Sequence, residues 1–337
     1  MKILTYIADL SVDNKAGGCK YCLTTVKQYS KHNVTLCGID DINDYDFDDF
    51  DIIHTHALHD KFLTKFNAKL IFGMHGFGFS CPPGGLYCMV LNKFLKEPLT
   101  CLDCLGYLGL KTGGNNLKKF LKMAKKSDAI SVDDKFMQEF YHVYNPLVMP
   151  LPMETNILAP CSSESKEDYI FYTGRLSFEK NPHGFVDIIN KAGIQAKMIV
   201  YDNVEDTMGI KSQYDDILNS TNKNIEIILN PVKEKMIELV KHARFTVLPY
   251  FFAEPFGVAA ANSVLCGTPL IAFPYGNARN MTQLLPNTLN EMIELLKMDD
   301  TQYKIELEKT LKKGEELRLI HKPENAIKIW DEAYDRL

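Results

Sequence analysis

The sequence predicts an α/β protein built from two doubly wound parallel sheets. The chain of 337 residues is longer than one hydrophobic core usually supports, so two domains are expected. Short apolar segments alternate with helical segments along most of the chain, which is typical of βαβ units. Several of the apolar segments have no polar face, as parallel strands covered by helices on both sides must be.

The expected elements follow this alternation in order. Strands are predicted at residues 2–7, 34–39, 51–56, 69–75, 129–132 and 147–151, then at 169–173, 196–201, 225–229, 245–249 and 270–273. Three prolines within 149–160 mark the boundary, which gives domains 1–150 and 151–337. Residues 80–114 interrupt the alternation with Gly, Pro and Cys, and are interpreted as an excursion from the first domain. The segment 301–337 is predicted to be helical with a break at Pro323, and its last helix is a candidate to return to the first domain.

Composition narrows the functional class. A net charge of -5 gives no general attraction to nucleic acid. No apolar run approaches the ~20 residues of a spanning helix, and "MKILTYIADL" reads as a first strand rather than a signal peptide. Nine cysteines in such a chain indicate reduced thiols or a metal, not a secreted disulfide framework. We therefore expect a cytoplasmic protein.

The stretch "FFAEPFGVAAANSVLCGTPLIAF" holds a carboxylate at the mouth of an apolar segment. Residues 257–266 are predicted to form a short helix, whose unpaired N-terminal amides suit an anion. Gly257 allows close backbone approach. Glu254 lies just ahead and would repel a phosphate, so it should meet a neutral group such as a sugar hydroxyl. The alternative is that Glu254 only caps a buried helix.

Two further segments carry chemistry. In "YTGRLSFEKNPHGF", Arg175 and Lys180 follow a strand and precede a helix, where open α/β sheets bind ligands. They form either a diphosphate clamp or a solvated basic loop. Gly17 and Gly18 follow the first strand and admit a close ligand. They do not complete the dinucleotide fingerprint, which disfavours nicotinamide binding.

Together these segments resemble the retaining glycosyltransferases of the GT-B fold, the large family that includes sucrose synthase, glycogen synthase and phosphatidylinositol mannosyltransferase. Its members carry a Gly-Gly loop after the first strand, a "GR…EK" segment and an E-x7-E motif near "EPFG". The matching pieces are Gly17–Gly18, "TGRLSFEKN" and "AEPFGVAAANSVLCGTPLIAF", and "DIIHTH" and "LIFGMHGF" fall at the family's third and fourth strands. The resemblance covers nearly the whole chain in order.

The resemblance implies two Rossmann-like domains facing across a cleft. It implies transfer of a sugar, with retention and without a catalytic metal, from a UDP-, GDP- or ADP-sugar to a glycan, lipid or protein. By this resemblance, Arg175 and Lys180 would bind the diphosphate, and Gly17 and Gly18 would pack against it. Glu254 would bind sugar hydroxyls, and the amides near Phe256, Gly257 and Val258 would contact sugar and phosphate. His75 would lie beside the reacting carbon of the sugar.

Two positions depart from the family pattern. Asn262 stands where the second Glu of E-x7-E would grip the ribose. A neutral hydrogen bond there weakens donor binding by on the order of 1–2 kcal/mol. Arg279 stands where many relatives have Glu. These departures keep two alternatives open, which are a sugar-nucleotide epimerase on the same fold and a pseudoenzyme that binds donor without turnover.

The cysteines of the excursion form a second pattern. Cys81, Cys88, Cys101 and Cys104 lie in a Gly/Pro-rich segment that suits tetrahedral zinc, and some microbial members of the family have a similar stretch. An iron–sulfur cluster or paired disulfides are the alternatives. Cys19 and Cys22 have helical spacing on an apolar face and are predicted to belong to the core.

Three weaker features complete the sequence. The Asp-x-Asp in 45–51 precedes a strand instead of following one, so we interpret it as a solvated acidic loop. His54 and His56 alternate on a strand, and are expected to line the cleft rather than bind metal. The lysines of 115–126 give a helix with a basic face. It is either an ordinary surface helix or a peripheral contact with anionic lipid.

Overall fold

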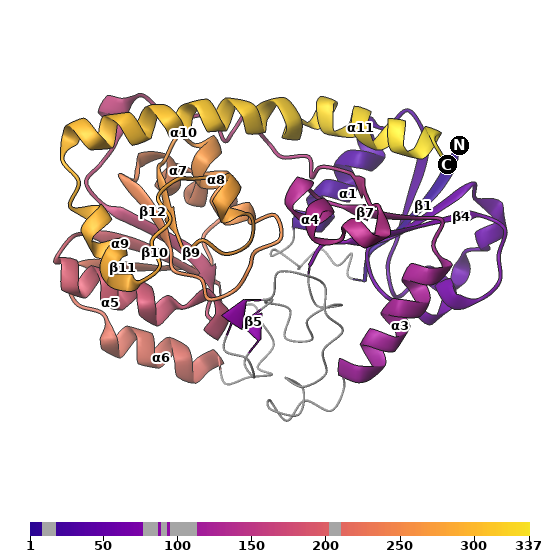
Figure 1. The fold of residues 1–337 in the computed structure, drawn as a ribbon, viewed down its shortest axis with the longest axis horizontal. Coiled ribbons are helices and arrows are strands. Elements are labelled where there is room, and N and C mark those ends of the chain that lie inside the picture. The colour runs from indigo at the N-terminus through magenta and orange to yellow at the C-terminus, as the bar shows by residue number, and fades with distance from the viewer. Residues whose placement is uncertain (9–17, 77–86, 89–92, 95–112, 202–209) are drawn as a thin grey trace. The chain divides into compact units, whose positions relative to one another are not determined.

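A computed structural model describes residues 1–8, 18–76, 87–88, 93–94, 113–201 and 210–337 of the chain. These residues form two compact units (Figure 1). Unit 1 comprises Met1–Met153 together with Ile320–Leu337, and unit 2 comprises Glu154–Leu319. Each unit is a parallel sheet covered by helices, so the predicted α/β class with two parallel sheets is confirmed.

Unit 1 is built on six parallel strands in the order β2-β1-β3-β4-β7-β8. The strands are β1 (Lys2–Tyr6), β2 (Asn33–Cys37), β3 (Ile52–Thr55), β4 (Lys69–Met74), β7 (Ala129–Val132) and β8 (Leu147–Val148). The helices are α1 (Gly18–Tyr29), α3 (Gly113–Lys126), α4 (Lys135–Phe140) and α11 (Pro323–Asp335), and α11 packs on α1. The strand order reverses between β1 and β3.

Unit 2 is built on five parallel strands in the order β11-β10-β9-β12-β13. The strands are β9 (Ile170–Arg175), β10 (Ala196–Tyr201), β11 (Ile225–Leu229), β12 (Phe245–Leu248) and β13 (Leu270–Ala272). The helices are α5 (Pro182–Ala192), α6 (Ile210–Ser220), α7 (Lys233–His242), α8 (Val258–Leu265), α9 (Leu289–Leu296) and α10 (Asp300–His321). The order reverses between β9 and β12, and open α/β sheets bind ligands at the carboxyl ends of the strands that flank such a reversal.

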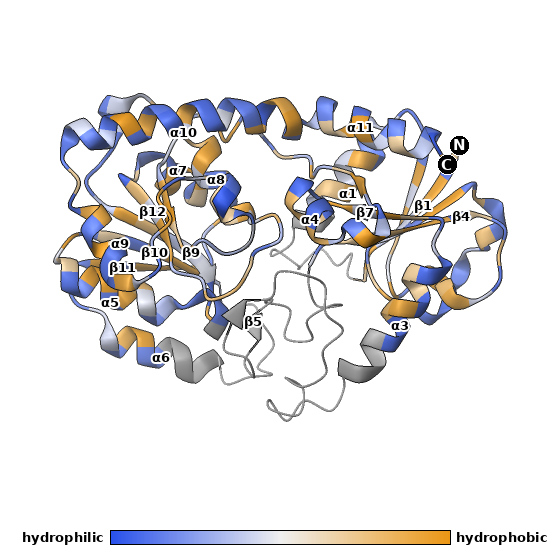
Figure 2. Cartoon of the chain, in the orientation of Figure 1, coloured by the Kyte–Doolittle hydropathy of each residue, from blue (hydrophilic) through white to orange (hydrophobic). Residues whose placement is uncertain are grey.

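The strands form because their segments are apolar on both faces. Figure 2 colours the strands of both sheets mostly hydrophobic, while the helices alternate between hydrophobic and hydrophilic residues. The central strands are buried along their length, as Phe171, Tyr172, Val247 and Ile71 illustrate. Every strand expected from the sequence of the two domains is present, with ends that differ by a few residues at most.

Local signals fix the helix ends that matter for the site. Asn181 has a left-handed backbone, and its side-chain oxygen accepts a hydrogen bond from the Gly184 amide at 3.0 Å, which caps α5. Pro182 follows as the first helical residue, and Gly193 ends α5 with a φ of +70°. A helix therefore follows Arg175 and Lys180, as the sequence predicted.

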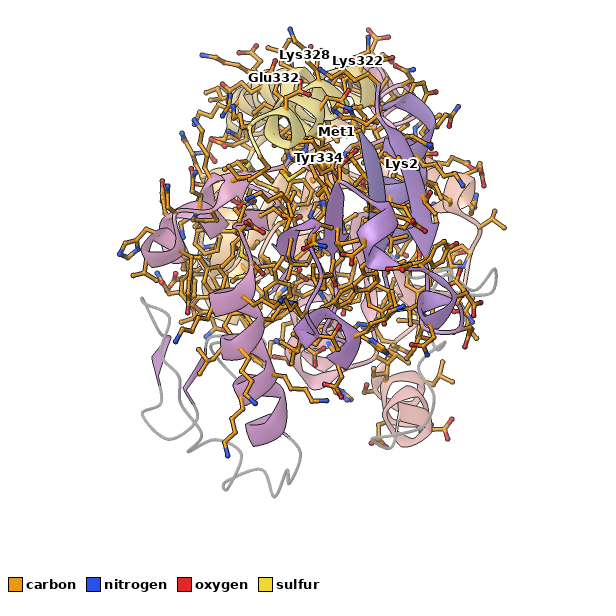
Figure 3. All side chains as sticks on the ribbon, turned by 90° about the vertical axis from the view of Figure 1, so that its right-hand side faces the viewer. Met1, Lys2, Lys322, Lys328, Glu332 and Tyr334 are labelled. Atoms are coloured by element: carbon orange, nitrogen blue, oxygen red, sulfur yellow. The ribbon has the colours of Figure 1, made fainter. Side chains whose placement is uncertain are left out.

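The end of the chain returns to unit 1. α10 ends at His321 and Pro323 begins α11, so the proline separates two helices. Trp330 on α11 is buried, and its indole N–H donates to the Pro150 carbonyl at 2.9 Å. Figure 3 shows Lys322, Lys328 and Glu332 on the outer side of α11, above the sheet that starts at Met1 and Lys2.

The excursion is described only in part. β5 (Tyr87–Cys88) pairs antiparallel with β6 (Lys93–Phe94), which the sequence analysis did not predict. No helix in the described ranges is both long and apolar enough to cross a membrane.

Candidate functional site

Lys180 and Glu254 form an ion pair at the strand reversal of unit 2. Lys180 ends the short 3-10 helix η6 (Phe178–Lys180) after β9, and Glu254 lies in the loop after β12. The side chains are 12% and 22% exposed, so both are largely withdrawn from water. The sequence assigned these residues to separate motifs, and the fold brings them into contact across 74 positions of the chain.

Aromatic rings hold Lys180 in place. Its ammonium nitrogen lies 4.2 Å from the centre of the Tyr250 ring and 4.5 Å from that of Phe252, within the range of cation–π attraction. The Tyr172 hydroxyl donates to the Lys180 carbonyl at 3.1 Å. A Cβ at Gly174 would lie 2.8 Å from that hydroxyl, so the Gly of the "TGR" segment makes room for this support. The cation of Lys180 is thus preorganised by the side chains around it.

The loop of Glu254 leads directly into α8. Gly257 precedes the helix with a φ of +80°, a conformation that favours glycine, and Val258 is the first helical residue. No side chain caps this N-terminus, and Phe256 is buried behind it. A small pocket adjoins Glu254 and Gly257, with Tyr250, Phe252, Ala260 and Tyr275 among its walls. The predicted helix is confirmed, and its N-terminus lies beside the Lys180–Glu254 pair.

A second loop fixes the position of the Glu254 backbone. The Asn277 amide donates to the Glu254 carbonyl at 2.9 Å, and the Asn277 side chain donates to the Phe256 carbonyl at 3.1 Å. Gly276 packs so closely that a Cβ there would lie 2.3 Å from the Glu254 carbonyl oxygen. The 3-10 helix η7 (Gly276–Asn280) therefore determines where the Glu254 backbone can lie.

The other predicted residues of unit 2 differ in their surroundings. Arg175, at the carboxyl end of β9, is exposed and pairs with Glu179 at 3.2 Å instead of joining the Lys180–Glu254 pair. Asn262 lies half-buried on α8, and its side chain makes no hydrogen bond to the described residues. Arg279 is exposed and its Nε donates to the Gly276 carbonyl at 3.1 Å.

In unit 1, His75 lies directly after β4 and uses both ring nitrogens. Nδ1 is 2.7 Å from the Asp133 carboxylate, and Nε2 is 2.5 Å from His56 Nδ1. The two imidazole rings are stacked with their centres 4.8 Å apart. A Cβ at Gly73 would come within 2.9 Å of His56, so this glycine leaves space for the pair.

Burial and Asp133 act in opposite directions on the pKa values of the cluster. Burial lowers the pKa of His54 to about 3, and burial followed by the neighbouring His54 and His75 lowers the pKa of His56. Burial also opposes the charge of His75, but the Asp133 carboxylate and its hydrogen bond outweigh it and raise the pKa of His75. The cluster thus concentrates its positive charge on His75.

His54 corrects one expectation. It is fully buried, and its ring bonds Tyr334 and Ser131 at 3.0 Å each, so it belongs to the core of unit 1 and does not line an open surface. The reason is that α11 covers the carboxyl half of β3, which the alternation of residues 51–56 could not reveal. The acidic loop agrees with its prediction, because Asp46 and Asp48 are exposed and accept backbone hydrogen bonds within unit 1.

Several predicted residues fall outside the description. Gly17 lies outside the described residues, whereas Gly18 is the first residue of α1. Cys81, Cys101 and Cys104 also lie outside them, and Cys88 belongs to β5. Cys22 is buried, as its prediction for the core requires. The zinc prediction therefore stays a prediction.

Sequence reasoning missed Asp133, His56 as a partner of His75, and the loop of Gly276 and Asn277. The available signals were weak. Asp133 follows an apolar strand in "ISVDD", and the "YGN" segment pairs a glycine with an amide side chain. Neither pattern names its partner, because the contacts join segments far apart in the sequence.

Comparison with known proteins bears on the family and the fold. Residues 155–284 match the family model of glycosyl transferases group 1. No curated protein has a sequence that matches the chain. Among solved structures, sucrose-phosphate synthase of Thermosynechococcus elongatus aligns with a TM-score of 0.76 at 12% identity, covering 99% of this chain and 98% of that one. Anabaena HepE in complex with UDP and glucose aligns with a TM-score of 0.72 at 14% identity over 100% of both chains.

A glycosyltransferase from Rickettsia africae aligns with a TM-score of 0.65 at 13% identity, covering 99% of this chain and 98% of that one. Sequence identities this low establish similarity of fold alone. The match to the family model applies only to residues 155–284. The chain therefore has the GT-B fold, and its residues 155–284, which lie within unit 2, match the glycosyl transferases group 1.

Proposed function

We propose that this chain is a retaining glycosyltransferase that moves a sugar from a nucleoside-diphosphate sugar to an acceptor. The match to glycosyl transferases group 1 supports the reaction class. Structural neighbours crystallised with UDP, and with UDP-glucose, support the class of donor. The donor would be a UDP-, GDP- or ADP-sugar, and the acceptor a glycan, lipid or protein.

The contact between Lys180 and Glu254 carries the proposal. In a nucleoside-diphosphate sugar, an anionic phosphate is joined directly to a ring of neutral hydroxyls. A cation and a carboxylate side by side match those two groups, since Lys180 would bind the phosphate and Glu254 would accept hydrogen bonds from the hydroxyls. The N-terminus of α8 adds amide donors for the same phosphate. Donor binding would therefore replace the internal ion pair with two ligand contacts.

Positive charge would also assist departure of the diphosphate. Lys180, Arg175 and the amides of Gly257 and Val258 supply fixed donors where charge develops on the leaving oxygen. With this charge in place, the proposal needs no catalytic metal. The leaving phosphate itself would accept the proton of the acceptor hydroxyl as it attacks from the same face, which gives retention without an enzyme nucleophile.

The test combines binding with product analysis. The protein is screened for thermal stabilisation by UDP-, GDP- and ADP-sugars, since a ligand at about 100 times its Kd adds about 2.7 kcal/mol of stability. The stabilising donor is then incubated with candidate acceptors, and the anomeric configuration of the product is read by NMR. Glu254→Gln should bind the donor more weakly, while Glu294→Gln, at an exposed position of α9, serves as the control. Inverted product, or no stabilisation by any nucleotide-sugar, would overturn the proposal.

Asn262 favours a second candidate, a pseudoenzyme that binds the donor without turnover. Its neutral side chain stands where the family resemblance places a ribose-binding Glu. Donor binding with no transfer and no release of free sugar would support this candidate. Release of an isomerised sugar without an acceptor would point to an epimerase instead.

We also propose that Cys81, Cys88, Cys101 and Cys104 bind one structural zinc. The support is their spacing in a segment with too many Gly and Pro residues to order itself by burial. Elemental analysis of protein purified without added metal tests it. Stoichiometric zinc is expected, whereas iron or a disulfide between any two of these thiols would replace the proposal.

We further propose a peripheral membrane contact through residues 115–126. Fewer lysines are available for it in the structure than the sequence suggested. Lys119 pairs with Asp60 at 2.9 Å, and Lys126 donates to backbone carbonyls, so these two lysines serve unit 1 itself. Lys118, Lys122 and Lys125 remain exposed on α3 beside Leu121. Sedimentation with vesicles that contain anionic lipid tests the contact, with neutral vesicles as the comparison. Equal sedimentation of a triple Lys→Gln variant at these three positions would contradict it.

A further inference from the structure

His75 has no ring nitrogen to spare for a ligand. Its Nδ1 meets Asp133 at 2.7 Å and its Nε2 meets His56 at 2.5 Å, yet its side chain is still 20% exposed. The exposed part is therefore the carbon edge or face of the ring. A residue held in this way can present charge to a ligand, but it cannot donate or accept a hydrogen bond without breaking the cluster.

The hydrogen-bond pattern restricts where the protons lie. The ionised Asp133 carboxylate only accepts, so His75 Nδ1 must carry a hydrogen. One further hydrogen lies between His75 Nε2 and His56 Nδ1. When it belongs to His75, that ring is an imidazolium and His56 is neutral with its own hydrogen on Nε2. When it belongs to His56, His75 is neutral.

The surroundings favour the first arrangement. Three titratable groups of the described elements face His75. They are His54 on β3, His56 directly after β3, and Asp133 directly after β7. His321 of α10 lies near Asp133. Burial lowers the pKa of each of the other three histidines. Among these groups only Asp133 brings a negative charge, and it contacts His75 directly.

We propose that Asp133 and His56 are positioning residues that hold His75 as an imidazolium, so that His75 is a fixed positive charge of unit 1 and not an acid or base. The inference rests on the proposed function, in which the ligand carries a diphosphate. A partly exposed cation in unit 1 then favours that anion electrostatically. In this state His56 Nε2 carries a hydrogen, and it is a buried atom without a hydrogen-bond partner among the described residues.

The inference has a defined dependence on pH. A raised pKa means that the charge of His75 is present below that pKa and is lost as the pH rises through it. Donor affinity should therefore fall on the alkaline side. In Asp133→Asn the amide oxygen still accepts the Nδ1 hydrogen, but the negative charge is gone. Burial then lowers the pKa of His75 without a carboxylate to oppose it, so the loss of donor affinity should move to lower pH.

Side-chain 15N NMR of the whole chain without ligand tests the protonation directly. The His75 signals are assigned by their loss in His75→Gln. We expect the wild-type ring to be protonated on both nitrogens above pH 6.5, and the transition to fall by about one pH unit or more in Asp133→Asn. His56→Gln should lower it by less. Asp134→Asn is the matched control, because it removes the adjacent carboxylate while asparagine still caps α4, and it should leave the transition in place.

Donor binding supplies the second measurement. Above the wild-type His75 transition, Asp133→Asn should bind the donor roughly tenfold more weakly than the wild type for each pH unit that separates the two transitions. A wild-type His75 that titrates at or below pH 6.5, or an unchanged transition in Asp133→Asn, would overturn the inference. If Asp133→Asn does not fold, the wild-type titration and His56→Gln decide. An NMR result as expected, in a protein that binds no nucleotide-sugar, would leave the proton assignment standing and reject the proposed function.

Discussion

At the scale of single residues, unit 2 keeps a cation and a carboxylate in contact with little water around them. Lys180 lies over two aromatic rings, and Glu254 is fixed through its own backbone by Asn277. Both side chains are therefore already positioned before a ligand binds. Electrostatic stabilisation of a transition state requires charges that are preorganised in this way.

We expect Lys180→Ala and Arg175→Ala each to lower sugar transfer by roughly a hundredfold or more, because removal of one such donor typically costs ~2.7–4 kcal/mol of transition-state stabilisation. Initial rates at saturating donor and acceptor are the measurement. Lys191→Ala is the matched control, since Lys191 forms an exposed pair with Asp187 on α5 of the same unit. Two folded variants with wild-type turnover would show that the diphosphate binds elsewhere.

Asn262→Glu should preserve or tighten donor binding. Asn262 is half-buried on α8 without a side-chain hydrogen bond to the described residues, so a longer acidic side chain breaks no contact there. A charged hydrogen bond to the ribose would add on the order of 1–2 kcal/mol. Calorimetry measures the affinity, and Asn262→Gln separates length from charge. A large loss in the Glu variant alone would mean that the pocket is built around a neutral residue.

At the scale of elements, the loops differ from the strands and helices in what sequence could predict. The strands were predictable because burial on both faces leaves a continuous apolar run, as in residues 270–273, and α5 because Asn181 and Pro182 mark its start. The placement of Glu254 by Gly276, and of His75 by Asp133, was not predictable. Each depends on a contact between loops that end different strands, and a local pattern carries no information about its distant partner.

Gly276→Ala should displace the Glu254 loop. The added Cβ would lie 2.3 Å from one backbone atom of Glu254 and 2.5 Å from another, and backbone cannot move aside as a flexible side chain can. We expect a loss of about 1–3 kcal/mol in the free energy of unfolding, together with weaker donor binding. Chemical denaturation and calorimetry measure the two effects.

Gly193→Ala is the matched control for that variant. Gly193 has a similar positive φ of +70°, but a Cβ added there would meet no described atom within 4 Å. It therefore reports the backbone strain alone, about 1–2 kcal/mol, without the clash. Equal effects of the two substitutions would show that η7 does not position Glu254.

At the scale of the whole molecule, unit 1 is assembled from both ends of the chain. Its sheet comes from the first 153 residues, yet α11 near the C-terminus packs on α1 and buries Trp330 and Tyr334. Residues of α11 also reach the histidine cluster, since Tyr334 bonds His54. The stability of unit 1 therefore depends on residues that follow the whole of unit 2.

Trp330→Ala should destabilise unit 1 by about 3–5 kcal/mol, the usual cost of removing a buried aromatic side chain. It should leave unit 2 nearly unchanged. Hydrogen exchange read by mass spectrometry distinguishes the units, with faster exchange expected in β1 and β3 than in β9 and β12. Lys328→Ala, at an exposed position of the same helix, is the control. Equal acceleration in both sheets would contradict an effect confined to unit 1.

The same residue makes the chain its own optical reporter. Trp330 is the only tryptophan in the sequence, so indole emission arises from one place in the molecule. Its ring stacks at 6.0 Å on that of His56, and its N–H is bonded to Pro150. A shift of the emission to longer wavelength during denaturation therefore reports the release of α11 from unit 1. It does not report the unfolding of unit 2. Circular dichroism sums over both units, so a gap between the two melting curves would measure how independently they unfold.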